Sequence, residues 1–133
     1  MKISIPKVVR PIRLSDYAPE FGEQVIGMWV NPPREKRLEF VDITERFAEV
    51  RGQIEATEDA DELRELFGRI KALGVEIYTW YAEMWSQGGD EWTGEDVQAL
   101  AEAALDTDPG LWDFLQESSL DAMSEYRTRK KLD

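Results

Sequence analysis

Apolar residues recur with two different periods, one before and one after residue 31. Between Gln24 and Val30, the run Q-V-I-G-M-W-V is rich in β-branched and aromatic residues, and Val8 to Leu14 alternates loosely around Pro11. The two runs predict a hairpin or two short paired strands. Because proline has no backbone donor, Pro11 should confine the first strand to an edge of the sheet, and that edge could accept another chain.

A helix is predicted to start at Asn31-Pro32-Pro33 and to run to about Ala56. The asparagine side chain can cap the free N–H groups of a helix start, and proline in the first turn loses no hydrogen bond. Behind this start, apolar residues recur at spacings of 3 and 4, which places them on one stripe. These residues are Phe40, Ile43, Phe47, Val50 and Ile54.

A second helix should follow the polar break Thr57-Glu58-Asp59. Gly68 and Gly74 each cost about 1 kcal/mol relative to alanine inside a helix, which suggests close packing or a bend. Two apolar stripes joined by a short turn favour an antiparallel helical hairpin, with core packing as the main role of both stripes. The second stripe comprises Leu63, Leu66, Ile70, Leu73, Ile77, Trp80 and Met84.

Two further helices are predicted after Gly88-Gly89. The capping pattern Thr93-Gly94-Glu95-Asp96 should open the third helix, and Asp108-Pro109 should open the fourth. The fold class that follows is mainly α, a small helical bundle with an N-terminal β-hairpin, in a single domain over residues 1–133. Its expected parts are a basic N-terminal segment with the hairpin (1–31), a four-helix region (32–127) and a basic tail (128–133). The fourth helix should direct Trp112, Leu115, Met123 and Tyr126 inward.

Charge is unevenly distributed along the chain. Residues 72–126 contain no lysine or arginine but 13 Asp and Glu, whereas both ends are basic and the net charge is −12. A surface whose only charge is negative repels nucleic acid and anionic lipid and favours basic or apolar protein partners. The acids can simply solvate outward helix faces, or they can also exclude wrong partners while the basic ends dock or self-associate.

The residue types exclude most enzyme chemistry. The chain has no histidine and no cysteine, which removes the usual nucleophilic triads and ordinary zinc sites. No calcium loop of the EF-hand type and no Gly-rich phosphate loop is present. Paired carboxylates for glycoside cleavage remain open, because only a cleft and a raised pKa would reveal them. We expect no catalytic residue, cofactor or metal site, although acids gather around one turn, namely Asp90, Glu91, Glu95 and Asp96.

Tryptophan is enriched both in cores and at protein-interface hot spots. Trp29, Trp80 and Trp112 are expected in the core, since they lie on predicted strand or helix stripes. Trp85 and Trp92 flank the glycine turn, where a helical stripe no longer dictates burial. They are the candidate partner-binding residues, with the edge of the core as the alternative. No apolar run is long enough for a membrane helix, and the first 13 residues do not read as a secretion signal.

The order of features resembles the tail assembly chaperones of long-tailed bacteriophages, in the short, non-frameshifted form. The resemblance covers about residues 8–126 and rests on element order and short turns. Its residues are the segment Pro11 to Tyr17, the strand end Trp29 to Pro33, and the acidic turn Gly89 to Asp96, followed by a Leu-rich acidic helix.

The resemblance implies a small acidic helical protein of the host cytoplasm. Such a protein binds the tape-measure protein, keeps it soluble, helps to recruit tail-tube subunits, and leaves as the tube polymerises. Ribosomal slippage near Lys130-Lys131 could give a longer form of the protein. Two alternatives stay open: a structural virion component that forms a ring in the tail or head, and an acidic DNA mimic that inhibits a host enzyme.

Overall fold

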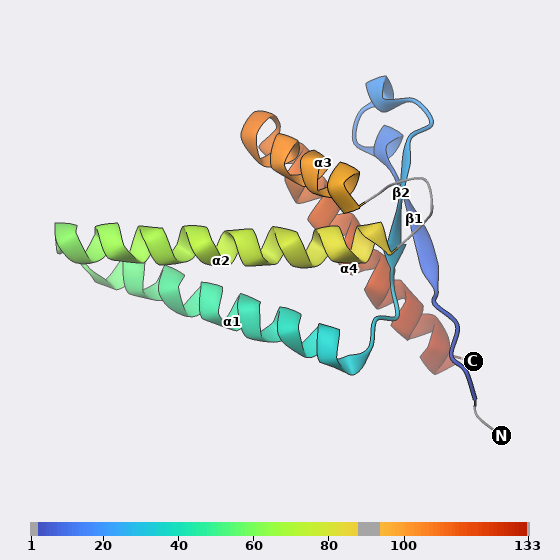
Figure 1. The fold of residues 1–133 in the computed structure, drawn as a ribbon, viewed down its shortest axis with the longest axis horizontal. Helices are drawn as coiled ribbons and strands as arrows, with labels where there is room; N and C mark the ends of the chain where they lie inside the picture. Colours follow the sequence, from blue (N-terminus) through green and yellow to red (C-terminus); the bar gives the residue numbers. More distant parts are fainter. Residues whose placement is uncertain (1–2, 88–93, 133) are drawn as a thin grey trace. The chain divides into compact units, whose positions relative to one another are not determined.

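The fold is mainly α-helical with an N-terminal β-hairpin, as the sequence predicts (Figure 1). The computed structural model describes residues 3–87 and 94–132, with side chains as far as Thr128. Contacts divide the chain into two compact units. We call residues 33–80 the α1–α2 unit, and residues 3–32 together with 81–132 the α3–α4 unit, in each case for the described residues.

The hairpin consists of β1 (Val9–Arg13) and β2 (Val25–Trp29), which pair antiparallel with Pro11 opposite Gly27. Two short 3-10 turns connect the strands, Leu14–Asp16 and Pro19–Phe21. Flanking bonds run from Val30 N to Val8 O and from Leu14 N to Gln24 O, so even-numbered residues of β1 face β2 through their backbone groups. Pro11 therefore lies where its N–H would point away from β2, and β1 is an edge strand within the described sheet, as predicted.

The predicted helix cap at Asn31 is wrong. Pro33 occupies the N-cap position of α1 (Arg34–Ala56), and no side chain caps this helix. The Asn31 side chain is used by the hairpin instead, because its Oδ1 accepts hydrogen bonds from Val8 N at 2.7 Å and from Trp29 Nε1 at 3.0 Å. Its Nδ2 donates to the Pro6 carbonyl at 2.9 Å. Asn31 thus fixes the irregular segment that precedes β1 rather than the helix that follows β2.

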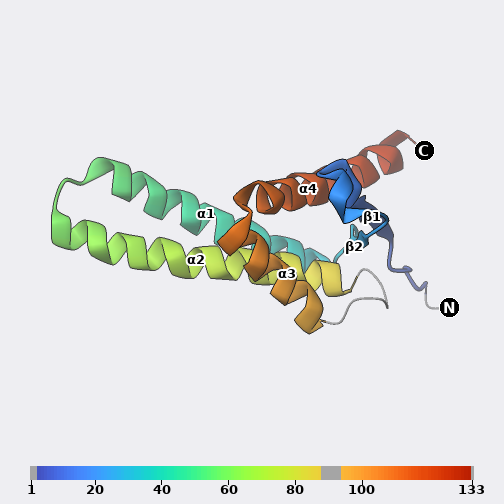
Figure 2. The same ribbon diagram turned by 90° about the horizontal axis from the view of Figure 1, so that it is seen from above.

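Helices α1 and α2 (Ala60–Ser86) form the predicted antiparallel pair and lie side by side in both ribbon views (Figures 1 and 2). Asp59 begins α2, since its Oδ1 accepts hydrogen bonds from the backbone of Asp61 and Glu62. Trp80 Nε1 donates to the Lys36 carbonyl at 2.8 Å at the other end of the pair. The seam between the two helices follows the predicted stripes, with Val50, Leu66 and Leu73 buried and Phe47, Ile54 and Ile70 packed against them.

The α3–α4 unit is completed by α3 (Gly94–Thr107) and α4 (Pro109–Leu132). Asp108 begins α4 as predicted, because its Oδ1 accepts a hydrogen bond from Leu111 N at 3.2 Å. The same carboxylate oxygen accepts a 2.6 Å bond from the Tyr17 hydroxyl, which joins the connection after β1 to α4. A Cβ at Gly110 would lie 2.8 Å from that hydroxyl, so glycine allows this close approach.

The close packing predicted at Gly68 and Gly74 is absent. A Cβ built at either position meets no heavy atom within 4 Å. These glycines therefore carry the helix-propensity cost without a packing contact to offset it among the described residues.

We predict that Gly68→Ala raises the free energy of unfolding by about 0.5–1 kcal/mol, because alanine lowers the entropy lost on folding and enters open space. Urea denaturation followed by circular dichroism measures the change. The matched control is Gly22→Ala, which should destabilise the protein, since Gly22 has φ +62° and alanine is strained there. A loss of stability in Gly68→Ala would show a contact at this position that the fold lacks.

Candidate protein-interaction surface

Trp85, one of the two predicted partner-binding residues, is buried with 1% of its surface exposed. Its Nε1 donates to Ser119 Oγ at 2.9 Å, and Ser119 Oγ donates in turn to the Leu115 carbonyl at 2.7 Å. The ring stacks on Tyr81 at 5.7 Å and meets the edge of Trp112 at 6.1 Å. The sequence left open whether Trp85 lies at the edge of the core or on a binding surface. The structure places it in the core, where no face of its ring is available to a partner.

Trp92, the second predicted partner-binding residue, lies outside the described residues, as does most of the acidic turn that contains it. A joint binding surface of Trp85 and Trp92, as the sequence predicted, is therefore contradicted for Trp85. A contact role for Trp92 stays a prediction from the sequence.

The described residues offer no reactive constellation. No three Asp or Glu residues within residues 3–87 and 95–128 are placed to hold a metal ion, and no buried side-chain nitrogen or oxygen in that part of the chain lacks a partner. A groove of about 320 Å³ lies between β1 and α4, where arginines from the strand face carboxylates from the helix and the connection after β1. Its charged lining residues are Arg10, Arg13, Asp16, Asp121 and Glu125.

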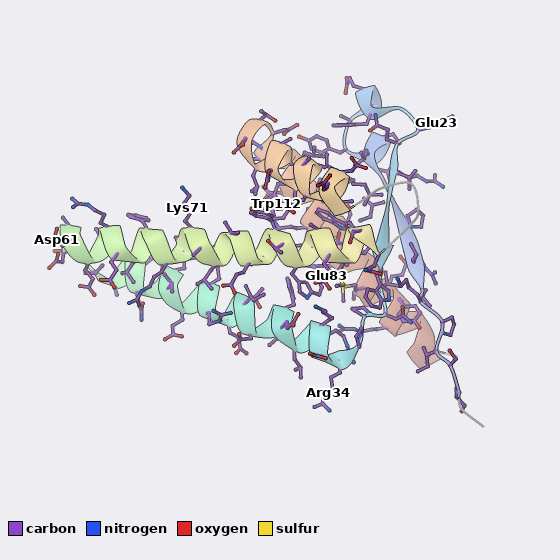
Figure 3. The ribbon with its side chains drawn as sticks, in the orientation of Figure 1. Glu23, Arg34, Asp61, Lys71, Glu83 and Trp112 are labelled. Atoms are coloured by element: carbon purple, nitrogen blue, oxygen red, sulfur yellow. The ribbon has the colours of Figure 1, made fainter. Side chains whose placement is uncertain are left out.

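Four of the eight large exposed apolar side chains among the described residues lie on the α1–α2 unit, and the other four are Ile3, Ile5, Leu105 and Leu120. Phe67 is 55% exposed, the largest side chain of this kind, and Leu38, Val41 and Val75 are 53%, 46% and 43% exposed. Val75 lies four residues after Lys71 and three before Tyr78, and residues at these spacings are neighbours on a helix surface. Lys71 points away from α1 (Figure 3). A two-helix pair buries only one stripe of each helix, which leaves these residues in water.

The seam separates the α1–α2 unit into two flanks, which we assign from helical spacing and one ion pair. Arg46 on α1 lies 3.5 Å from Glu76 on α2, so the stripes that contain these two residues share one side of the seam. We call it the Glu76 flank. Its charged residues are Glu35, Glu39, Asp42, Arg46 and Glu49 on α1, and Glu62, Glu65, Arg69 and Glu76 on α2.

The stripes on the other side of the seam form the Phe67 flank. It has four basic residues and one acid, whereas the Glu76 flank has seven acids and two basic residues. The two sides of one helical pair therefore carry opposite net charge. The Phe67 flank comprises Arg37, Val41, Thr44, Ala48, Arg51 and Glu55 on α1, and Ala60, Arg64, Phe67, Lys71, Gly74 and Tyr78 on α2.

Sequence reasoning missed this flank. The signal was present, because Phe67, Lys71, Gly74 and Tyr78 recur at spacings of 4, 3 and 4, like the core stripe beside them. Their common side with Arg51 follows only from the register of the two helices.

No protein-family model, curated protein or solved structure matches this chain. Among the described residues, no helix combines the length and apolar character needed to cross a bilayer.

We predict that Trp85→Ala lowers the free energy of unfolding by about 3–5 kcal/mol, because it leaves a cavity in the α3–α4 unit and removes the bond to Ser119. Phe67→Ala is the comparison, and its effect should stay within about 0.5 kcal/mol, as is typical of exposed positions. Chemical denaturation of both variants measures the difference. Equal effects would contradict the assignment of Trp85 to the core and Phe67 to the surface.

Tyr81 provides a second prediction, because burial raises the pKa of its hydroxyl above the ordinary value of 10.0. The folded protein then holds this proton at a pH where the unfolded chain has released it, so stability falls as the pH rises above about 10. Tyr81→Phe should reduce this alkaline loss, which urea denaturation at about pH 8 and about pH 11 would reveal. A smaller dependence should remain from Tyr17, since its hydrogen bond to Asp108 also raises its pKa. An unchanged pH dependence in Tyr81→Phe would contradict the prediction.

Proposed function

We propose that this protein is an assembly chaperone of the phage tail type, which binds the tape-measure protein in the host cytoplasm and helps to recruit tail-tube subunits. The observation that carries the proposal is the set of large apolar side chains exposed on the α1–α2 unit, with Phe67 at 55% exposure. A long helical client needs a partner that covers its apolar stripe before assembly, and exposed apolar residues on a helical pair can do this.

The net charge of −12 supports a chaperone that coats a client in many copies. Like charges on neighbouring copies oppose clumping while each copy holds its client through a local contact. Trp85 is no part of the proposed contact, because it is buried.

Co-expression with a tape-measure protein, the proposed client, tests the proposal. We predict that the soluble fraction of that client rises at least about fivefold in the presence of this chain, and that Phe67→Glu removes most of the gain, since a carboxylate interrupts the apolar contact. Quantitative electrophoresis of soluble and pelleted fractions gives the measurement. The matched control is Leu105→Glu, the same change at an exposed leucine of α3.

Purified particles distinguish the proposal from a structural virion component. A chaperone is absent from the finished particle, whereas a structural component remains in a fixed copy number. Recovery of the chain in mature particles, or a client that is equally soluble without it, would overturn the proposed function.

A further inference from the structure

We propose that the Phe67 flank binds an acidic amphipathic helix of another protein, with the helix's apolar stripe over Phe67 and Val41 and its carboxylates against the flanking basic side chains. The inference rests on the proposed function in one respect, that the occupant is a helical client. It adds the surface that binds the client and the charge that the client carries. The basic side chains are Arg37, Arg51, Arg64 and Lys71.

The pairing of basic residues differs between the two flanks. On the Glu76 flank, Arg46 contacts Asp42 at 3.1 Å and Glu76 at 3.5 Å, and Arg69 contacts Glu65 at 2.9 Å. On the Phe67 flank, the basic residues lack such partners within the described chain, apart from Arg64, which lies 3.9 Å from an almost fully exposed Asp61. The cations without an ion pair are Arg37, Arg51 and Lys71.

Apolar and basic side chains alternate along the flank, with Lys71 between Phe67 and Tyr78 on α2. Phe67 and Val41 are about half exposed, Tyr78 is half-buried, and the small residues Ala48 and Gly74 lie between the larger side chains. From Arg64 to Tyr78 the flank follows α2 for 15 residues, or about 21 Å at 1.5 Å per residue, which equals about four helical turns. A partner helix placed along this flank would meet apolar side chains with a cation close to each, which suits an amphipathic helix with acids beside its apolar stripe.

Charge also distinguishes the possible occupants. Two copies of the Phe67 flank facing each other would oppose four basic residues with four basic residues, which disfavours a symmetric dimer through this surface. Within this chain, α3 is acidic, but its apolar residues Val97, Ala101 and Ala104 are at most 1% exposed in their own unit. Neither of these two arrangements provides an apolar stripe with carboxylates on both sides, and we therefore assign the occupant to another protein.

Two synthetic peptides of about 22 residues test the proposal on the full-length protein. Both have the same Leu and Ala stripe, and the residues beside the stripe are Glu in one peptide and Lys in the other. Fluorescence anisotropy of the labelled peptides gives their affinities at about 50 mM and about 300 mM NaCl. We expect the Glu peptide to bind at least about tenfold more tightly than the Lys peptide at low salt, and the difference to shrink at high salt.

Charge reversal identifies the surface. The double variant Arg51→Glu with Lys71→Glu should weaken binding of the Glu peptide about tenfold. The matched control is Arg46→Glu with Arg69→Glu, which changes net charge by the same amount on the Glu76 flank and should alter affinity less than about threefold. Phe67→Ala should weaken both peptides. Circular dichroism establishes that each variant keeps its helical content.

Several results would overturn the proposal: equal binding of the two peptides, no binding of the Glu peptide at about 1 mM, or equal weakening by both double variants. Concentration-dependent self-association in sedimentation, abolished by Arg51→Glu with Lys71→Glu, would assign the flank to a second copy instead. If that variant still solubilises the client as well as the unchanged chain does, this inference fails while the proposed function stands.

Discussion

The apolar seam between α1 and α2 is the interaction on which the candidate surface depends. Val50, Leu66 and Leu73 are buried there, and Phe47, Ile54 and Ile70 pack against them. This seam holds the two helices in one register, which brings Arg46 to Glu76 and leaves Phe67 on the same side as Arg51. Since a pair of helices buries one stripe of each, the two flanks stay in solvent and can differ in charge without loss of core packing.

The α3–α4 unit uses its aromatic residues differently. Tyr81, Trp85 and Trp112 pack on one another, and the side chains of Tyr81 and Trp85 are each 1% exposed. Ser119 satisfies the Trp85 N–H, as a buried polar group requires. Trp85 and Trp112 thus stabilise the fold. Trp29, which the sequence placed in the core, is only half-buried, because it lies on the face of β2 opposite Ile26 and Met28. Phe67, by contrast, is exposed and has no polar group to satisfy.

The spacing of apolar residues predicted the helices and the hairpin, because burial of one face of an element imposes that spacing within the element itself. The apolar stripe between Leu63 and Met84 predicted the second helix, and the two apolar runs on either side of a turn predicted the hairpin. Asn31 was misassigned because its hydrogen-bond partners, Val8 N and Pro6 O, are more than 20 residues away in the chain. Trp85 was ambiguous for the same reason, since Ser119 and Trp112 come from a later helix. The Phe67 flank required the register of two helices, which no single stripe contains.

The net charge of the chain and the charge of the Phe67 flank act over different distances. The 13 acids of residues 72–126 repel an acidic partner, but salt screens this repulsion beyond about 8 Å. All eight basic residues between Leu14 and Tyr126 fall within positions 34–71, and four of them belong to the Phe67 flank. If the Phe67 flank binds an acidic helix as proposed, the acids of residues 72–126 would disfavour other positions for that helix, while cations without ion pairs lie beside exposed apolar groups on the flank. The partner would then be selected by exclusion as well as by contact.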